Sequence, residues 1–454
     1  MALTGLQIYK LLPRTNCREC GFPTCLAFAM KLAAKQAELA ACPYVSEESK
    51  AQLEAASQPP IRLITLARDG RKLEVGNEIV LYRHEKTFYH PTGIIVRVKD
   101  TQPVAEVEKT AAFVENYNVD YVGIKLHYDG MAIENASGDP ATFAACVKAV
   151  SAKTKYPLVL MANDPKALAA ALEVTKGTTP LIYAADASNW QGMVELAKTV
   201  KAPLAVKASD LGALAELTQQ VKAAGVEDIV LDPAAHSVHA ALTLNTQIRR
   251  LALKNFRPLG YPTIIFAGVA DTTGDGLPAG AAADETVMAA QGIAKYAGFV
   301  VLDHADAASA YPLLTLRQNI YTDPQKPIQV QPGLYELNNP KPTSPVLVST
   351  NFSITYFSVA NEVEGSGLPA WLLIADADGM SVLTAWAAGK FDADKIAKTV
   401  AITGITDKVE RKLIVIPGHT AVLLGELEEA LKGWDIRVGP REAVDLPAFM
   451  KTLG

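Results

Sequence analysis

The chain has 454 residues, of which 49% are hydrophobic and 20% charged, and its formal net charge is −5. This length exceeds what one hydrophobic core normally serves, so we expect two or three domains. The negative net charge argues against a nucleic-acid partner, no stretch approaches the about 20 apolar residues of a membrane-spanning helix, and the first residues lack the apolar segment of a secretion signal. Four of the five cysteines lie close together, unlike a disulfide framework, which favours a reducing, cytoplasmic location.

The first functional pattern is a group of cysteines at Cys17, Cys20, Cys25 and Cys42, and we expect an iron–sulfur domain over residues 1–57. Thiolates this close in sequence usually bind a metal ion or a metal cluster. Three closely spaced cysteines plus a fourth that is followed by proline favour a 4Fe–4S cluster. A structural zinc site stays open as an alternative, although zinc ribbons usually carry two C-x2-C pairs and only one is present.

Two helices are expected around these cysteines, over residues 3–11 and 26–39, because apolar residues recur there at helical spacing. Cys146 stands alone in an alanine-rich helical segment. We interpret it as a small buried hydrophobic residue rather than a metal ligand.

Residues 61–330 alternate eight times between a short apolar run and an amphipathic segment, after a small hairpin expected over 72–83. Because the runs are almost continuously apolar, they predict parallel strands that are buried on both faces. Eight strand–helix units in this length predict a TIM barrel. The eight predicted strands cover residues 93–98, 121–126, 157–161, 180–184, 203–207, 228–231, 262–266 and 298–302.

The C-terminal ends of barrel strands are where functional side chains normally lie. Helix caps are the simpler interpretation for many of these residues, as for Asp164 before Pro165. A pterin site is the alternative, because some barrels that bind methylated pterins carry an asparagine and an Asp-Pro segment there, as Asn163 and Asp232-Pro233 do. The glycine-rich loop at 273–276 can cradle a phosphate, although such a loop is more often only a connection. The candidates are His127, Asn163, Asp164, Asp186, Lys207, Asp232, Asp271, Asp303 and His304.

A third domain is expected over residues 340–454, after proline-rich stretches at 331–333 and 338–345 that predict a linker. Its alternating pattern predicts an open α/β sheet with a ligand crevice outside the carboxyl ends of the strands. Serine, threonine and glycine are frequent at those ends and offer hydrogen bonds to a large ligand. His419 is interpreted as a hydrogen-bonding residue at the rim rather than a metal ligand. The strands are predicted over 346–350, 371–376, 413–417 and 435–438, and the helices begin near 354, 382 and 420.

Three segments together carry a resemblance to a known family. They are the run from Leu11 through Cys17, Cys20 and Cys25, the pair Cys42-Pro43, and the C-terminal segment from Asp378 to Trp386. With the barrel between them, the chain resembles the large subunits of corrinoid iron–sulfur proteins, the methyl carriers of the acetyl-CoA (Wood–Ljungdahl) pathway. The resemblance spans the whole chain, and the cysteine segment is its most specific part.

This resemblance implies that Cys17, Cys20, Cys25 and Cys42 bind a 4Fe–4S cluster and that the C-terminal domain holds a cobalt corrinoid. It implies a heterodimer with a small barrel subunit and a role as a methyltransferase-type component. Its cobalt would take a methyl group from methyltetrahydrofolate through a methyltransferase and pass it to carbon monoxide dehydrogenase/acetyl-CoA synthase. The cluster would reduce inactive Co(II), with a reductive activator as a further partner.

The sequence has no Asp-x-His-x-x-Gly motif, which is consistent with a corrinoid without a histidine ligand. A short linker at 340–345 would let the corrinoid domain swing between partners. The alternatives are a self-sufficient pterin-dependent methyltransferase that uses Asn163 and Asp232 of its own barrel, and a zinc protein with a noncatalytic barrel. The resemblance indicates the corrinoid-binding region, and strand-end position suggests the residues: Thr350, Ser353, Gly379, Ser381, Val382, Leu383, Thr384, Gly389, Gly418 and Thr420.

Overall fold

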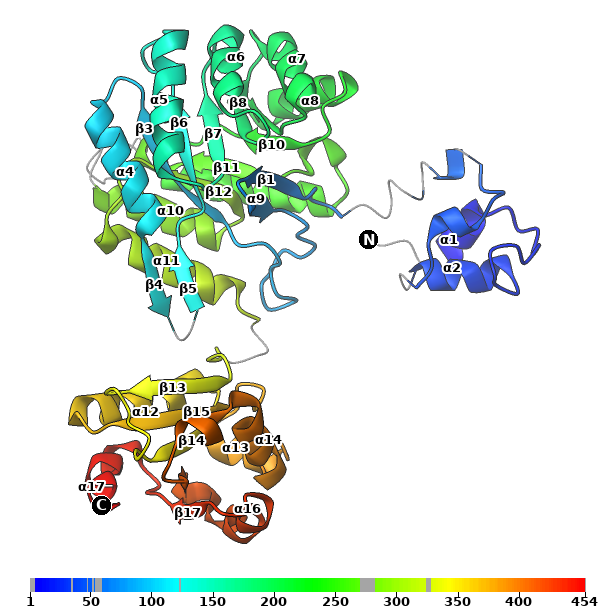
Figure 1. Ribbon diagram of the computed structural model, residues 1–454. Helices are drawn as coiled ribbons and strands as arrows, with labels where there is room; N and C mark the ends of the chain where they lie inside the picture. The colour runs from blue at the N-terminus through cyan, green and yellow to red at the C-terminus, as the bar shows by residue number, and fades with distance from the viewer. Residues whose placement is uncertain are drawn as a thin grey trace. The chain divides into compact units, whose positions relative to one another are not determined.

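The computed structural model describes residues 5–33, 36–46, 48–50, 53, 59–121, 124–269, 282–323 and 328–453. The chain divides into two compact units (Figure 1). The first consists of Met1–Tyr117 and His127–Tyr321, and the second of Asn118–Leu126 and Thr322–Gly454. In the part of the chain that is described, no helix combines the length and apolar character that crossing a membrane requires.

The N-terminal segment forms two short helices, α1 (Gly5–Leu11) and α2 (Cys25–Ala33), and a 3-10 helix, η1 (Leu39–Ala41). They pack around a small hydrophobic cluster in which Phe28 and Ala29 are fully buried. The second helix was expected to run from 26 to 39, but α2 ends at Ala33 and residues 36–38 are not helical. Residues 34 and 35 lie outside the described residues.

A hairpin precedes the barrel, formed by β1 (Ile64–Arg68) and β2 (Arg71–Val75), which pair in antiparallel fashion. The expected range of 72–83 was therefore wrong for this hairpin. One face is apolar because its buried residues alternate along both strands, and this face joins the cluster that fills the barrel. Leu73 of the hairpin lies against Gly93, which is the first residue of the first barrel strand. The hairpin therefore covers the N-terminal end of the barrel.

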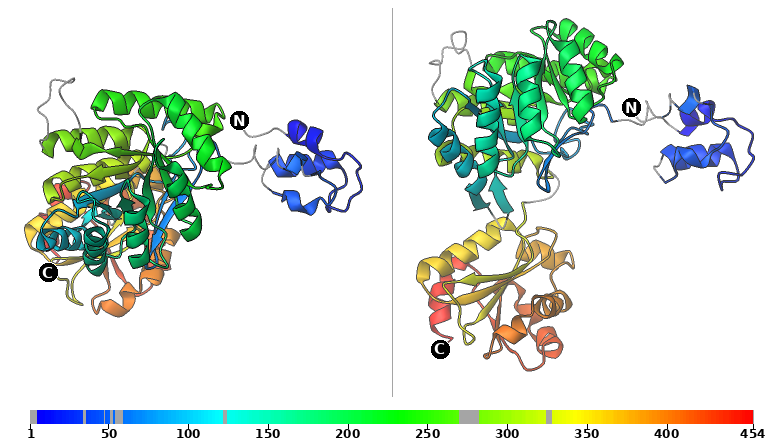
Figure 2. Two further views of the ribbon diagram at one scale, coloured as in Figure 1. Left: turned by 90° about the horizontal axis from the view of Figure 1, so that it is seen from above. Right: turned by 45° about the horizontal axis from the view of Figure 1, so that its top comes forward.

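The predicted TIM barrel is confirmed: eight parallel strands close on themselves, and helices lie outside them (Figure 1 and Figure 2). Every strand is mostly buried, as expected of strands covered on both faces. The strands are β3 (Gly93–Lys99), β6 (Gly130–Glu134), β7 (Leu158–Met161), β8 (Leu181–Ala185), β9 (Leu204–Lys207), β10 (Ile229–Asp232), β11 (Thr263–Phe266) and β12 (Ala297–Leu302). The helices are α4 (Val104–Asn116), α5 (Pro140–Lys153), α6 (Pro165–Val174), α7 (Trp190–Val200), α8 (Leu211–Ala223), α9 (Val238–Leu253), α10 (Ala282–Ala294) and α11 (Ala307–Tyr321).

One predicted barrel strand is not in the barrel. The predicted strand at 121–126 overlaps a separate hairpin of β4 (Asn118–Tyr121) and β5 (Ile124–His127), and residues 118–126 group with the second unit. The barrel uses β6 instead, where Gly130 to Ile133 are all buried. A side chain at Gly130 would collide with the Pro157 carbonyl oxygen, 2.9 Å from the position of a Cβ. Close strand packing therefore requires a small residue there, which hides β6 from a search for large apolar runs.

The second unit contains a five-stranded sheet in the order β13-β15-β14-β16-β17, in which only the edge strand β13 is antiparallel. Alternate residues of the central strands belong to two hydrophobic clusters, one on each face. Helices α13, α14 and α16 pack on one face and α12 and α17 on the other, as an open α/β sheet requires. The strands are β13 (Gly333–Leu337), β14 (Val346–Thr350), β15 (Ala370–Ala375), β16 (Leu413–Ile416) and β17 (Asp435–Val438). The helices are α12 (Ser353–Ser366), α13 (Val382–Ala387), α14 (Ala393–Thr403), α15 (Ile405–Lys408), α16 (Leu424–Ala430) and α17 (Leu446–Lys451), with 3-10 helices η5 (Gly418–Leu423) and η6 (Ala443–Asp445).

The proline-rich stretch at 338–345 lies between β13 and β14 and is not a linker, contrary to the sequence-based expectation. β13 pairs with β15 along its whole length. The Asn338 amide donates hydrogen bonds to the Val363 and Leu368 carbonyl oxygens at 2.8 and 3.0 Å. The Trp371 indole donates to the Lys341 carbonyl oxygen at 3.3 Å. Residues 338–345 are thus fixed within the second unit, and a hinge at 340–345 is excluded.

Candidate functional site

The four clustered cysteines come from three places around α2. Cys17 and Cys20 lie in the loop before the helix, Cys25 is its first residue, and Cys42 follows η1. All are free thiols; Cys17 is exposed, Cys20 is half-buried, and Cys25 and Cys42 are buried. Cys20, Cys25 and Cys42 belong to one hydrophobic cluster with Phe28. Loop, helix and return segment therefore bring three of the four thiols to the same small core.

The loop that carries the first cysteines is fixed by its own hydrogen bonds. The Asn16 side-chain oxygen accepts from the Cys25 backbone N–H at 2.8 Å, and the Gly21 N–H donates to the Arg18 carbonyl oxygen at 2.9 Å. Gly21 has a φ of +83°, which glycine adopts without steric cost. Cys25 stands at the N-terminus of α2, where the helix dipole favours a negatively charged group.

The chemistry of the donor atoms supports a metal group at these thiols, but their arrangement in this structure does not. Among the residues that the structure describes, no three His, Cys, Asp or Glu side chains form a group that could hold a metal ion. Four free thiols around an apolar core are nevertheless the donor set that iron–sulfur clusters and zinc both use. The sulfurs have to draw together around such a group, and Cys17, which is exposed and lies outside that core, has to join the three other thiols.

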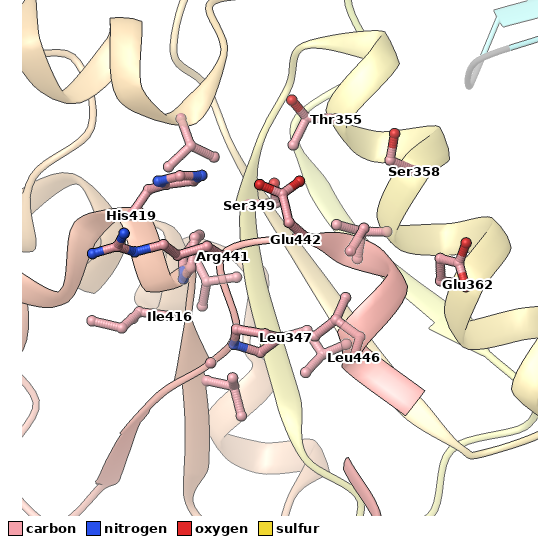
Figure 3. Close-up of a pocket in the computed structure, with 18 of the residues that line it drawn as sticks. Leu347, Ser349, Thr355, Ser358, Glu362, Ile416, His419, Arg441, Glu442 and Leu446 are labelled. Carbon is pink, nitrogen blue, oxygen red and sulfur yellow. The ribbon is translucent and has the colours of Figure 1, made fainter. Parts of the chain in front are cut away.

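A cavity of about 560 Å³ lies at the carboxyl ends of β14 and β16 in the second unit. Figure 3 shows His419 and Arg441 on one side, and Thr355, Ser358 and Glu362 of α12 on the other. The apolar part of the lining includes Leu347, Val382, Leu383, Ile416 and Leu446. This mixture of apolar walls and a few polar groups is typical of a small-molecule site.

Three apolar side chains that line this cavity are strongly exposed. Ile354 is 64% exposed, Leu383 46% and Val444 66%, and the neighbouring Trp386 is 40% exposed. Ser349, in contrast, is 1% exposed, and its hydroxyl has no hydrogen-bond partner in the described part of the chain. An apolar rim around a partly polar cavity is the kind of surface that a cofactor or a partner protein covers.

Asn351 organises the loop beside this cavity. It is 1% exposed, and its side-chain oxygen accepts hydrogen bonds from the Ala377 and Gly379 backbone N–H groups at 2.9 and 3.0 Å. Its amide nitrogen donates to Asp376 Oδ1 at 3.2 Å and to Gln329 Oε1 at 3.1 Å. A single side chain directly after β14 therefore holds the loop that follows β15 in place.

The barrel has a second cavity, of about 270 Å³, at the C-terminal ends of its strands. It brings together three of the predicted residues, Asn163, Lys207 and Asp232. Asp164 is instead the N-cap of α6, and its carboxylate accepts from the Lys166 N–H at 2.9 Å. Asp186 accepts from the Ser188 N–H at 2.7 Å and holds a turn. The cap interpretation is thus confirmed for Asp164, and Asp186 also has a local structural role.

The other predicted strand-end residues do not line this cavity. Asp303 binds the Arg97 guanidinium with both oxygens at 2.7 Å. The His304 ring faces the buried carboxylate of Glu285 at 2.6 Å, and the His127 ring faces the Tyr128 carbonyl oxygen at 2.6 Å. Asp271 and the glycine-rich loop at 273–276 lie outside the described residues.

Comparison with known proteins gives the family. Residues 63–450 match the family described as CO dehydrogenase/acetyl-CoA synthase delta subunit. Residues 12–44 match a short family described as "Putative Fe-S cluster". The corrinoid/iron-sulfur protein large subunit of Moorella thermoacetica is 45% identical over 452 residues, which cover 99% of each chain. The chain belongs to the family of these large subunits.

A more distant member of this family also matches over nearly its whole length. The acetyl-CoA decarbonylase/synthase complex subunit gamma of Methanopyrus kandleri is 34% identical over 100% of this chain and 98% of its own. The resemblance inferred from the cysteine and C-terminal segments is therefore confirmed. A crystal structure of dihydropteroate synthase from Thermus thermophilus is 15% identical, with a TM-score of 0.41, and covers 57% of this chain and 100% of its own. We draw no functional conclusion from that likeness.

Within this family member, three of the residues predicted to contact a corrinoid line the large cavity: Ser381, Val382 and Leu383. Thr384 lies beside them, and its hydroxyl is 3.0 Å from that of Ser381. Ser353 begins α12, next to Ile354 in the lining. These residues stay predictions as cofactor contacts, and the structure places them together at one edge of the sheet.

The remaining predicted contacts are not among the residues that line the cavity. Thr350 and Thr420 are fully buried, and the Thr420 hydroxyl donates to the Pro417 carbonyl oxygen at 3.0 Å. A side chain at Gly418 would approach the Gly439 carbonyl oxygen to 2.6 Å, so this glycine permits close packing of two strand ends. Gly379 and Gly389 have φ angles of +70° and +66° and make turns. Thr420 and the three glycines shape the backbone near the cavity, whereas the buried Thr350 hydroxyl has no hydrogen-bond partner in the described part of the chain.

Arg441 and Glu442 line the large cavity and were not predicted. They follow β17, the last strand of the sheet, so strand-end position indicates them as well as it indicates residues after β14 and β15. Asn351 was missed as an organising residue because its role depends on loops that are distant in sequence.

Proposed function

We propose that this chain is the large subunit of a corrinoid iron–sulfur protein and serves as a methyl carrier of the acetyl-CoA pathway, in the cytoplasm. The observation that carries the proposal is the 45% identity to such a subunit over 99% of both chains. In this role the chain works with other enzymes and does not complete a reaction alone. The alternative of a self-sufficient pterin-dependent methyltransferase has no comparable support.

Cys17, Cys20, Cys25 and Cys42 would hold a 4Fe–4S cluster, which supplies one-electron reduction when bound. The match of residues 12–44 to an iron–sulfur family supports this assignment over zinc. The surrounding residues would serve that group in two ways. The N-terminus of α2 favours its negative charge, and the cluster of Phe28 and Ile8 keeps water from Cys25 and Cys42.

The large cavity of the second unit would hold the corrinoid, whose cobalt carries the methyl group. Ser381, Val382 and Leu383 would contact it directly, with Ser349 and Thr355 as hydroxyl partners for its amide groups. Thr350, Ser353, Gly379, Thr384, Gly389, Gly418 and Thr420 would support the same region. The domain that holds it includes β13, so we place the functional divisions at an iron–sulfur domain over 1–57, the barrel, and a corrinoid domain that begins before residue 340.

The subunit would work in a complex, and its exposed apolar rim supports contact with partners. Ile354, Leu383, Trp386 and Val444 expose their apolar side chains at or near the cavity, as surfaces that a partner covers often do. We propose a small barrel subunit as the permanent partner. A methyltetrahydrofolate:corrinoid methyltransferase, carbon monoxide dehydrogenase/acetyl-CoA synthase and a reductive activator would dock in turn.

The decisive experiment is anaerobic purification with the small subunit, followed by metal analysis and methyl-transfer assays. We expect about four iron atoms and one cobalt atom per heterodimer, together with corrinoid absorption bands that change on reduction. Methyl acceptance should require the separate methyltransferase. Iron without cobalt would refute the carrier role, zinc alone would refute the cluster as well, and methyl transfer by the isolated chain would favour the alternative.

A further inference from the structure

The barrel cavity has a built interior that the carrier function does not use. Its apolar part is formed by Met161, Tyr183 and Phe266, each less than 10% exposed, from three different strands. Its polar part includes Asp232 and Lys207. At about 270 Å³, the cavity is slightly below the usual size range of small-molecule sites, so it suits one compact ring system.

Asp232 places a carboxylate at the bottom of this cavity. The residue is 3% exposed. One of its oxygens accepts from the Tyr183 hydroxyl at 2.6 Å, and the other accepts from the Ala234 N–H at 2.8 Å. A carboxylate oxygen can accept two hydrogen bonds, so each oxygen retains one position for a donor. Burial without a direct cationic partner raises the pKa of this group, although the hydrogen bonds from Tyr183 and Ala234 and the charge of Lys207 oppose the shift.

Lys207 supplies the complementary donor. It pairs in register with Asp232 across β9 and β10, so the two side chains lie on adjacent strands at the same level. In the described part of the chain its ammonium group has no hydrogen-bond or ion-pair partner. The other cation of the cavity is already committed, because Arg97 binds Asp303 with two hydrogen bonds and Glu134 at 3.1 Å.

We propose that the barrel mouth binds a planar 2-amino-4-oxo nitrogen heterocycle, the ring system that pterins and guanine share. Such a ring presents two adjacent N–H donors and a neighbouring carbonyl oxygen along one edge. The two donors match the free positions of the Asp232 oxygens, and the carbonyl oxygen matches the ammonium group of Lys207. The ring faces would contact Met161 and Phe266. Asn163 and His236, exposed at the rim, would meet the substituents of the ring.

Calorimetric titration of the full-length protein tests this site directly, and its outcome does not depend on whether the chain carries a corrinoid. The probes are 6-methylpterin and guanosine, with adenosine as a ring that lacks the 2-amino-4-oxo edge. We expect saturable binding of one or both of the first two and none of adenosine. Binding of 6-methylpterin alone assigns the site to pterins, and binding of guanosine alone assigns it to guanine compounds. Equal binding of adenosine, or no binding of any probe at millimolar concentration, overturns the proposal.

Two variants locate the binding. Asp232→Asn replaces the carboxylate that would accept from the two N–H groups of the ring, and Lys207→Met removes the ammonium group that would donate to its carbonyl oxygen. Both changes keep the side-chain volume nearly the same, and each should weaken binding about tenfold or more. The matched control is Asp210→Asn, which changes the N-cap of α8 outside the cavity and should leave binding unchanged. Lys207 is only half-buried, so its variant stays informative if Asp232→Asn does not fold. Equal binding by Lys207→Met and the control would overturn the proposed edge recognition.

Discussion

Asp232 shows how the burial of one carboxylate lowers the stability of a folded protein. A carboxylate that is 3% exposed loses most of its hydration, and two hydrogen bonds do not restore it. Its pKa is therefore raised from the ordinary value of 3.8, with burial as the largest cause. From pH 3.8 up to the raised pKa the folded state holds a proton that the unfolded state has released. The free energy of unfolding consequently falls as the pH rises through this window.

Asp232→Asn should remove this pH dependence, because an amide stays neutral at every pH. Relative to the wild-type protein, the thermal unfolding midpoint of the variant should rise as the pH increases from 4 to 7.5. Thermal unfolding at four pH values, with the Asp210→Asn variant as control, measures the difference. A difference that is constant across this range would show that the ionisation of Asp232 is not linked to folding.

At the scale of a single element, the loop after β15 depends on Asn351. Asn351→Ala leaves the Ala377 and Gly379 N–H groups without their acceptor in a buried loop. We expect a loss of about 2 to 4 kcal/mol in the stability of the second unit, from two unsatisfied donors. Since this loop leads into Ser381 and Leu383, cobalt content should also fall.

Denaturant unfolding and cobalt analysis of the purified heterodimer measure both effects. Asn116→Ala, at the end of α4 in the barrel, is the control and should leave the cobalt content unchanged. Full cobalt content in the Asn351 variant would mean that the loop does not position the cofactor.

Most barrel strands could be predicted because both of their faces are buried, which makes runs such as 157–161 and 203–207 almost continuously apolar. β6 could not be found in this way, since Gly130 and Ala132 satisfy packing by being small. β13 is a half-exposed edge strand next to prolines, so its sequence resembles a linker. Strand pairing, which joins it to β15, is a long-range property that local pattern does not contain.

The candidate sites also differ in how much of each could be predicted from the sequence. The cysteine group could be predicted because its signal is local spacing. Strand-end position indicated the edge of the second sheet but not the direction of individual side chains, so Thr350 and Thr420 turned out to be buried. Cys146, which is 7% exposed and whose pKa burial raises to about 11, behaves as the small hydrophobic residue that its surroundings predicted.

At the scale of the whole molecule, the cysteine group and the large cavity belong to different compact units. Cys20→Ser combined with Cys25→Ser should remove nearly all iron while leaving the cobalt content unchanged. If the cluster only restores oxidised cofactor, methyl transfer from chemically reduced protein should persist, and reductive reactivation should be lost.

Iron and cobalt analysis with single-turnover methyl-transfer assays would test this separation. Cys146→Ala, in α5 of the barrel, is the matched control and should retain its iron. Loss of cobalt together with iron would contradict the independence of the two sites.

The hairpin of residues 118–126 makes the second unit discontinuous in the chain. Its Asp120 lies close enough to Tyr335 and Tyr356 for its charge to help raise the pKa of both, after burial as the main cause. During synthesis the hairpin leaves the ribosome long before the five-stranded sheet. It therefore cannot pack against that sheet until the barrel residues have been synthesised as well. The second unit therefore completes late and through a long loop closure. A fragment of residues 322–454 alone would lack part of its own fold.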